Sequence, residues 1–224
     1  MNTRLKTGIC LLFVMLFVFS CATQKGEEEM TRKRTFATPE EAAREAQKNL
    51  LEILESTKDL NLGIDPGKLK NAKLADLIQY LILDFDKILS TESVESLSQI
   101  VASKKSFVAP FVLDNEVVGV AQVAQYADGW KVSELANSAI QSDLNESVAM
   151  QRSDGGVTLY EVPNLQLMIY GVRMRDKEMY LLDFEQGSIK KAVPVEAFYG
   201  PMRDKAIQFQ KEYGELLKKE KLVD

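Results

Sequence analysis

The segment SFVAPFVLDNEVVGVAQVAQYADGWKV, residues 106–132, carries the clearest structural signal in the chain. Apolar runs lie on both sides of Asp114-Asn115, and a further apolar run follows Asp128-Gly129. Asp, Asn and Gly tolerate the backbone conformations that tight turns between strands require. We therefore predict a three-stranded antiparallel meander with its turns at these two pairs.

The residues after the meander predict further helices and strands. The stretch 136–151 has apolar residues at helical spacing, which indicates a middle helix. A last helix is expected to begin at Gly200-Pro201. Between these helices, apolar runs predict three more strands, at 157–162, 165–173 and 178–184.

The residues before the meander begin with a helix signal. Thr38 can cap a helix, Pro39 suits its first turn and Glu41 can complete a capping box, so we predict a helix over 39–57. The stretch 61–71 contains Gly63 and Asp65-Pro66-Gly67 and predicts a loop.

The apolar run over 77–86 fits either a buried strand or part of a helix, because its length and spacing satisfy both patterns. We favour the strand. A short helix is then expected to begin at Ser90 or Thr91 and to end at about residue 103.

Strand runs interrupted by helices, without regular alternation, favour an α+β fold. We expect mainly antiparallel β-meanders packed with N-terminal, middle and C-terminal helices. Residues 38–224 contain no fixed repeat and no Pro-rich linker, so we expect them to form a single domain. The order of hairpin and helices resembles cystatin-like folds, and this resemblance implies protease inhibition as one activity to consider.

The N-terminus has the layout of a secretory signal peptide. Arg4 and Lys6 precede an uncharged apolar run over residues 8–19. A membrane-spanning helix needs about 20 apolar residues, and this run is shorter. We predict that residues 1–20 form a cleaved signal peptide.

The signal segment ends in Val18-Phe19-Ser20-Cys21, which resembles the lipobox of bacterial lipoprotein precursors. Phe19 is bulkier than the residue usual at its position in that pattern. The resemblance implies cleavage before Cys21 and attachment of lipid to its thiol. Cys10 lies in the part that would be removed, and a single remaining cysteine cannot build a disulfide framework.

A second processing route stays open, because Ser20 and Ala22 also match the small pair of an ordinary cleavage site. Cleavage after Ala22 would release a soluble protein.

In the lipoprotein interpretation, residues 21–37 form a flexible tether and the partner is a membrane. Ala22 stands where Asp would resemble an inner-membrane retention signal, which implies the outer membrane. The acidic run over 24–29 resembles export tags of surface lipoproteins, so periplasmic and surface-exposed locations both stay open.

Charge and histidine content exclude several function classes. The net charge of the whole chain is −5, and removal of Arg4 and Lys6 with the signal peptide makes it about −7, so we expect no nucleic-acid partner. The chain contains no histidine, which excludes His-assisted nucleophiles and His-rich metal sites. Phosphate-binding loops are also missing from the sequence, and we expect neither a cofactor nor a metal.

Two residue pairs remain as candidate sites. Asp84 and Asp86 would share one face of a strand, and paired carboxylates can divide general acid and base roles. With 33 acidic residues in the chain, two hydrated acids at the end of an element are the simpler interpretation. Tyr126 and Trp130 flank the second turn and could form an aromatic binding surface or pin the meander as core residues.

These observations favour a non-catalytic binding or accessory module, lipid-anchored in the cell envelope, that contacts another envelope protein, a peptide or a ligand. The alternatives are a carboxylate-dependent hydrolase that uses Asp84 and Asp86, and a cystatin-like protease inhibitor.

Overall fold

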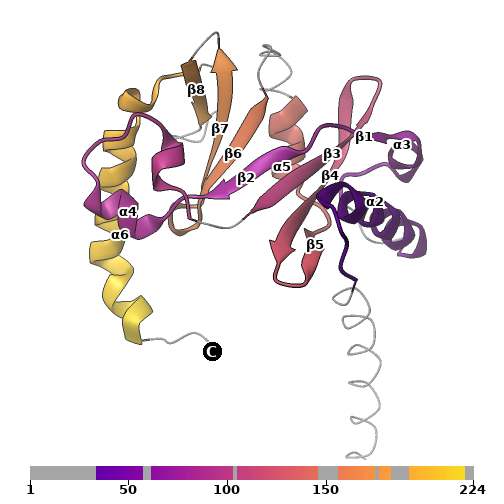
Figure 1. Cartoon of the computed structure of the whole chain (residues 1–224), viewed down its shortest axis with the longest axis horizontal. Helices are drawn as coiled ribbons and strands as arrows, with labels where there is room; N and C mark the ends of the chain where they lie inside the picture. The colour runs from indigo at the N-terminus through magenta and orange to yellow at the C-terminus, as the bar shows by residue number, and fades with distance from the viewer. Residues whose placement is uncertain are drawn as a thin grey trace, which may run out of the picture.

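A computed structural model describes residues 34–57, 62–102, 105–145, 156–174, 177–182 and 192–219, with side chains as far as residue 214. The predicted signal peptide, Cys21 and most of the predicted tether lie outside the described residues. Phe36, near the end of the predicted tether, pairs with Trp130 through two backbone hydrogen bonds and so belongs to the folded part. Within them, one eight-stranded sheet has the order β5-β4-β3-β2-β6-β7-β8, and β1 pairs with β3 (Figure 1). No helix of this part is long and apolar enough to cross a bilayer.

The elements confirm the predicted α+β class. Every described strand pairing is antiparallel except that of β2 with β6, which is parallel. The strands are β1 Lys73–Leu74, β2 Ile78–Ile82, β3 Ser106–Leu113, β4 Glu116–Tyr126, β5 Gly129–Glu134, β6 Val157–Val162, β7 Leu167–Met174 and β8 Lys177–Leu182. The α-helices are α2 Pro39–Ser56, α3 Pro66–Asn71, α4 Phe85–Ser90, α5 Ser138–Asp143 and α6 Tyr199–Lys219, and short 3-10 helices are η1 Leu97–Ile100, η4 Pro163–Leu165 and η5 Val195–Ala197.

The predicted meander is confirmed as β3, β4 and β5. Asp114 and Asn115 adopt φ angles of 50° and 67°, the left-handed conformation that a two-residue hairpin turn requires. The second turn lies one residue earlier than predicted, because Gly129 already pairs with Tyr126 as the first residue of β5. Gly129 has φ 134°, and a Cβ there would lie 2.9 Å from the carbonyl oxygen of Phe36, so this position requires glycine.

The capping signals at the first helix are also confirmed. The Thr38 hydroxyl accepts a hydrogen bond from the Glu41 amide at 3.2 Å. The Glu41 carboxylate accepts one from the Ala37 amide at 3.1 Å, one residue before the cap. The first bond satisfies an amide that the first turn of α2 leaves without a partner, and the second fixes the chain just before the helix.

Two local predictions need correction for the same physical reason, which is that an aspartate starts a helix inside the predicted loop and inside the predicted strand. The predicted loop over 61–71 contains α3, because Asp65 caps it through the amides of Gly67 and Lys68. The predicted strand over 77–86 is confirmed at β2 but ends sooner, because Asp84 caps α4. The helix expected from Ser90 or Thr91 is instead the short η1.

The later elements follow the predictions closely. β6 has the predicted bounds, β7 and β8 begin within two residues of them, and α6 begins at Tyr199. The predicted middle helix over 136–151 is observed as α5, and residues 146–151 lie outside the described residues.

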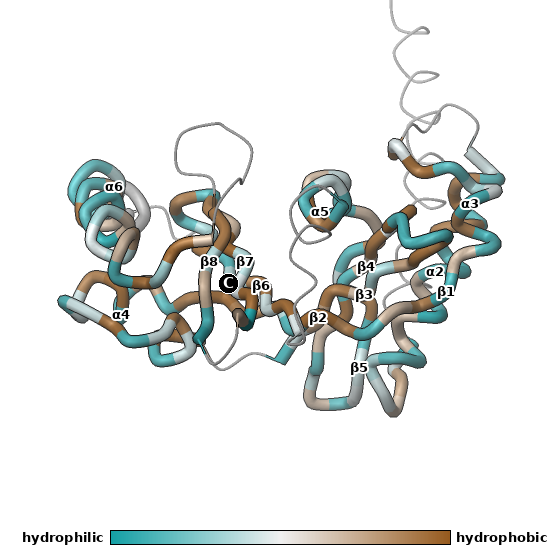
Figure 2. The backbone as a smooth tube through the Cα atoms, turned by 90° about the horizontal axis from the view of Figure 1, so that it is seen from above, coloured by the Kyte–Doolittle hydropathy of each residue, from teal (hydrophilic) through white to brown (hydrophobic). Residues whose placement is uncertain are grey.

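The two faces of the sheet carry different layers. Along β2, Tyr80 belongs to the buried cluster beneath α5, whereas Leu81 packs in the cluster of α4 and α6. A third cluster joins α2 and α3 to β3, β4 and β5. Figure 2 shows α5 over the middle of the sheet, between α6 at one end and α2 and α3 at the other.

A hydrogen-bonded carboxylate ties η1 to the far strands. Glu178 accepts hydrogen bonds from the hydroxyls of Tyr160 at 2.9 Å, Tyr180 at 2.6 Å and Ser96 at 2.9 Å. Gly171 provides the space for this arrangement, because a Cβ there would lie 2.7 Å from Glu178 Oε1 and 2.9 Å from a Tyr160 ring carbon. The network therefore depends on a residue without a side chain.

We predict that Gly171→Ala lowers the free energy of unfolding by about 1–3 kcal/mol, since the added methyl group displaces a packed ring and a bonded carboxylate. Urea unfolding of the full chain measures this difference. Gly200→Ala is the control, because a Cβ at Gly200 meets no atom within 4 Å. Equal unfolding midpoints for the two variants would contradict the prediction.

Candidate ligand-binding site

Pro110 interrupts the ladder of hydrogen bonds in the middle of the sheet. Pro110 lies in β3, which pairs with β4 along one side. Along the other side of β3, β1 pairs with Phe111 and Val112, and β2 pairs with residues 106–108. The Ala75 amide donates to the Pro110 carbonyl at 3.0 Å, so the Pro110 nitrogen faces the same side. Proline has no N–H to donate there. Ala75 can therefore form only one of the two backbone hydrogen bonds with Pro110, and the segment divides into β1 and β2, with residues 75–77 between them.

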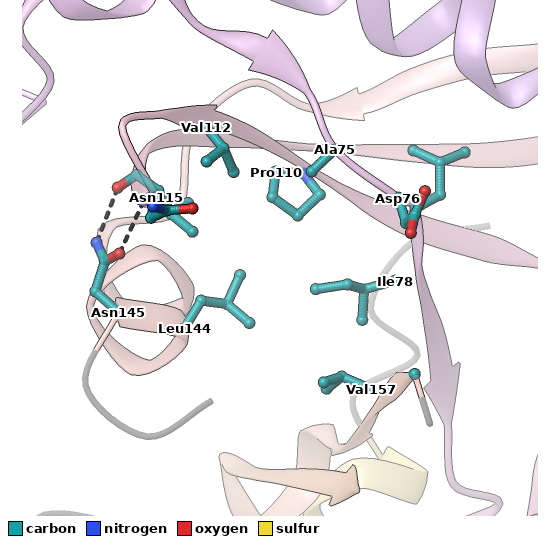
Figure 3. A pocket seen from close by; sticks show the side chains of 12 residues that line it. Ala75, Asp76, Ile78, Pro110, Val112, Asn115, Leu144, Asn145 and Val157 are labelled. Carbon is teal, nitrogen blue, oxygen red and sulfur yellow. Dashed lines mark hydrogen bonds between the residues drawn. The ribbon is translucent and has the colours of Figure 1, made fainter. Parts of the chain in front are cut away.

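A pocket of about 320 Å³ lies at this interruption, between the sheet and the end of α5 (Figure 3). This volume is within the range of small-molecule sites, roughly 300–1,000 Å³. Its walls are mainly apolar. They are formed by Ala75, Ile78, Pro110, Val112, Leu144 and Val157, which come from β2, β3, β6, α5 and the segment before β2.

Asn145 fixes one wall of the pocket. Its side-chain oxygen accepts a hydrogen bond from the Val117 amide, and its side-chain nitrogen donates to the Val117 carbonyl, both at 2.8 Å. The amide thus pairs with β4 as a neighbouring strand would. Because both of its polar ends are engaged, Asn145 holds the end of α5 beside the pocket.

Asp76 and Asn115 are the other polar side chains that line the described part of the pocket, and both are exposed. Asp76 makes no hydrogen bond or ion pair with the described residues. Its carboxylate lies at the rim, on the side of Ile78 (Figure 3). An apolar cavity with a few polar groups at its edge can bind a small molecule and orient it.

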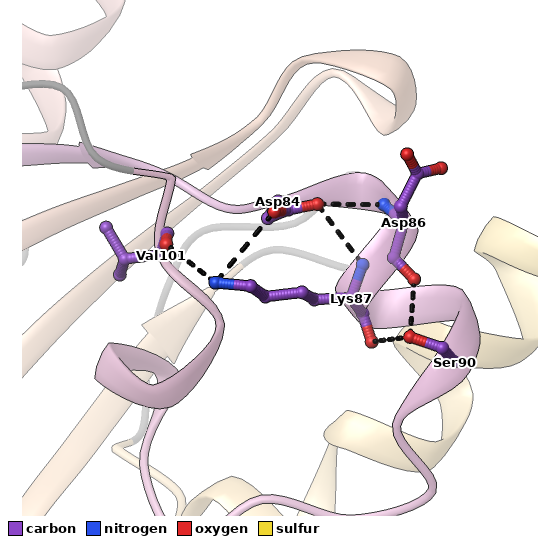
Figure 4. A network of polar contacts seen from close by, with 5 residues as sticks. All are labelled: Asp84, Asp86, Lys87, Ser90 and Val101. Carbon is purple, nitrogen blue, oxygen red and sulfur yellow. Dashed lines mark hydrogen bonds and ion pairs between the residues drawn. The ribbon is translucent and has the colours of Figure 1, made fainter.

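The structure places the predicted carboxylate pair at the start of α4 (Figure 4). Asp84 Oδ1 accepts hydrogen bonds from the amides of Asp86 at 3.1 Å and Lys87 at 3.2 Å. The Asp86 carboxylate points away from that of Asp84 in Figure 4. The two residues do not share a strand face as expected, and Asp84 acts as a helix cap.

The predicted aromatic pair is divided between core and surface. Trp130 is only 9% exposed, and its ring lies 5.5 Å from that of Phe107. Tyr126 is 43% exposed, and the Lys131 ammonium lies 5.3 Å from its ring centre. Trp130 therefore stabilises the meander core, and a contact surface at this turn stays a prediction for Tyr126 alone.

Neither the predicted carboxylates nor the predicted aromatics line the pocket. Pro110 was the one sequence feature that could have indicated the pocket, since a proline inside an apolar strand marks an edge or an interruption of pairing. The contribution of α5 and β6 to its walls carries no such signal. Among the described residues, no group of three or more acidic, cysteine or histidine side chains could hold a metal ion.

Carboxylates gather on the α5 face of the sheet, near the start of α5. Tyr80 donates a hydrogen bond to Glu161, and the side chain of Asn137 donates one to Glu134 at 3.3 Å. Burial raises the pKa of Glu134 above its ordinary value of 4.5, the hydrogen bond from Asn137 opposes this shift, and the negative charge of Glu161 adds to it. Ionised Glu134 therefore disfavours the folded state.

We predict that Glu134→Gln stabilises the protein near pH 7 by less than about 1 kcal/mol, because the side chain is partly exposed. A raised pKa in the folded state means that the native residue contributes stability below its unfolded pKa. This contribution is lost as the pH rises through the folded pKa. The advantage of the variant should thus grow from pH 4 to pH 7 in urea unfolding. A constant difference over that range would contradict the prediction.

The chain matches no family model, no curated protein and no solved structure. A function for the pocket therefore has to be inferred from the chemistry of its own residues.

Proposed function

We propose that this chain is a lipid-anchored protein of the cell envelope that binds a small ligand in the pocket beside Pro110 and does not catalyse a reaction. The observation that carries the binding role is the apolar cavity of about 320 Å³ with Asp76 and Asn115 at its rim. Burial of apolar ligand surface is the main source of affinity in such a site.

The arrangement of the wall supports binding. Leu144 is 6% exposed and belongs to the buried cluster under α5, and Asn145 fixes the adjacent backbone to β4. Pro110 and Ala75 are fixed by the hydrogen bond between their backbones. A cavity whose walls are held before the ligand arrives loses less conformational entropy on binding.

The proposed anchor rests on the residues at the end of the apolar N-terminal run. Val18-Phe19-Ser20-Cys21 resembles a lipobox, and Cys21 would be the single cysteine of the mature chain. Two or three acyl chains on one residue hold a protein at a bilayer effectively permanently, whereas one chain gives marginal binding. The pocket would then sample ligands close to a membrane surface.

The pocket is tested with cyclohexanol, a small water-soluble probe, titrated into the full chain held in lipid nanodiscs. We expect saturable shifts of the Ile78 and Leu144 methyl signals in NMR spectra. Ala75→Phe should abolish these shifts, because a phenyl group at Ala75 fills the pocket. Ala127→Phe is the matched control, since Ala127 is exposed at the opposite end of β4.

Val157→Phe closes the pocket from the β6 side and gives a second, independent variant. The binding role would be overturned if the native chain showed no saturable shifts. It would also be overturned if Ala75→Phe and Val157→Phe both bound cyclohexanol as tightly as the native chain.

The anchor is tested by replacing Cys21 with serine in cells supplied with a fatty-acid probe. We predict that Cys21→Ser loses the label and leaves the membrane fraction, because serine has no thiol to acylate. Cys10→Ser is the control and should remain labelled, since Cys10 belongs to the predicted signal peptide. The anchor would be contradicted if the native chain took up no fatty-acid label and if the native chain and Cys21→Ser were found in the membrane fraction in equal proportion.

A further inference from the structure

We propose that the ligand of this pocket is a small apolar molecule that carries a cationic amino group, and that the amino group pairs with Asp76. This inference rests on the proposed binding role and adds the chemical class of the ligand.

Asp76 is the only ionisable residue among those that line the described part of the pocket. Its carboxylate has no hydrogen-bond or ion-pair partner among the described residues. A carboxylate accepts hydrogen bonds and favours cations, so the chemistry that complements it is an ammonium group.

The neighbouring charges do not supply that ammonium group to Asp76. Lys68, near the hairpin turn, already pairs with Glu116, and their side chains are 2.8 Å apart. Lys73 lies opposite Val112 on β1, but it does not line the pocket and no ion pair joins it to Asp76. Asp114 in the adjacent turn and the net charge of −5 favour cations further.

The second polar group at the rim is compatible with the same ligand. Asn115 can accept a hydrogen bond from an ammonium group through its side-chain oxygen. Asn145 is already engaged with Val117 through both its oxygen and its nitrogen, so we assign it to the wall of the pocket. The carboxylate at the rim therefore sets the charge preference, and the cavity behind it sets the preference for an apolar body.

The expected size of the preference follows from exposure. Asp76 is exposed, and ion pairs in such positions contribute about 0.2–1 kcal/mol. We therefore expect an amine to bind about threefold more tightly than a neutral molecule of the same shape. A carboxylate of similar shape should bind more weakly than the neutral molecule, since it meets an unpaired negative charge.

The experiment compares cyclohexylamine, cyclohexanol and cyclohexanecarboxylate, each titrated into the full chain in nanodiscs with the Ile78 and Leu144 methyl signals as the readout. The expected order of affinity is amine, alcohol, carboxylate. Asp76→Asn should bring the amine to the affinity of the alcohol. Asp86→Asn removes the same charge from an exposed residue away from the pocket and should leave the order unchanged.

The outcomes separate this inference from the binding role beneath it. The ligand class would be overturned by any of three results: equal affinities for the amine and the alcohol, a higher affinity for the carboxylate than for the alcohol, or an amine preference that persists in Asp76→Asn. Each of these results would leave the pocket as a binding site. Absence of saturable binding by all three probes would overturn the proposed binding role itself. Raising the salt concentration should reduce the amine preference alone, because salt screens an exposed ion pair.

Discussion

The parallel pairing of β2 with β6 is the constraint on which the rest of this structure depends. It joins two antiparallel groups of strands, β2 to β5 and β6 to β8, into one sheet, through the register Gln79–Thr158 to Ile82–Glu161. Tyr80 and Leu159 thereby lie on the face under α5, and Leu81 and Tyr160 lie on the opposite face. A shift of one residue would exchange these sets, because side chains alternate along a strand. Long-range pairing of this kind also brings the pocket walls together.

The pocket lies where a central strand lacks one hydrogen-bond donor. Pro110 occupies a strand that pairs on both sides, where proline is uncommon. The regular strand pairing of the neighbouring segment is interrupted at residues 75–77. The cavity lies beside this interruption, between the sheet and the end of α5. On the other side of the pocket, the Asn145 side chain pairs with Val117 at the edge of β4 that faces away from β3. The interruption of strand pairing at Pro110 is thus bordered by a concave pocket, and hydrogen bonds of Ala75 and Asn145 hold parts of its wall.

Buried tyrosines satisfy several of the carboxylates that the core would otherwise exclude. Tyr160 and Tyr180 donate to Glu178, Tyr80 to Glu161, and Tyr170 to Asp143 at 2.6 Å. Burial is the main cause of a raised pKa at each of these phenols, which for Tyr180 reaches about 12. The hydroxyls consequently remain protonated and act as donors at neutral pH. These contacts link α5 and η1 to the sheet and give acidic residues in this histidine-free chain a structural role.

The sequence by itself determined what depends on neighbouring residues. The Asp114-Asn115 turn, the Thr38 cap and the strand at 157–162 follow from short patterns, because turn and cap conformations are set within a few residues. The same locality explains the errors at Asp65 and Asp84, since an aspartate before a short segment signals a turn and a helix cap alike. Only the tertiary structure decided that β2 lies beside β6, that Trp130 is core, and that Asp76, Leu144 and Val157 line one cavity. Those positions depend on contacts between residues far apart in the chain, and the free energy of such contacts comes from packing and burial that no short pattern encodes.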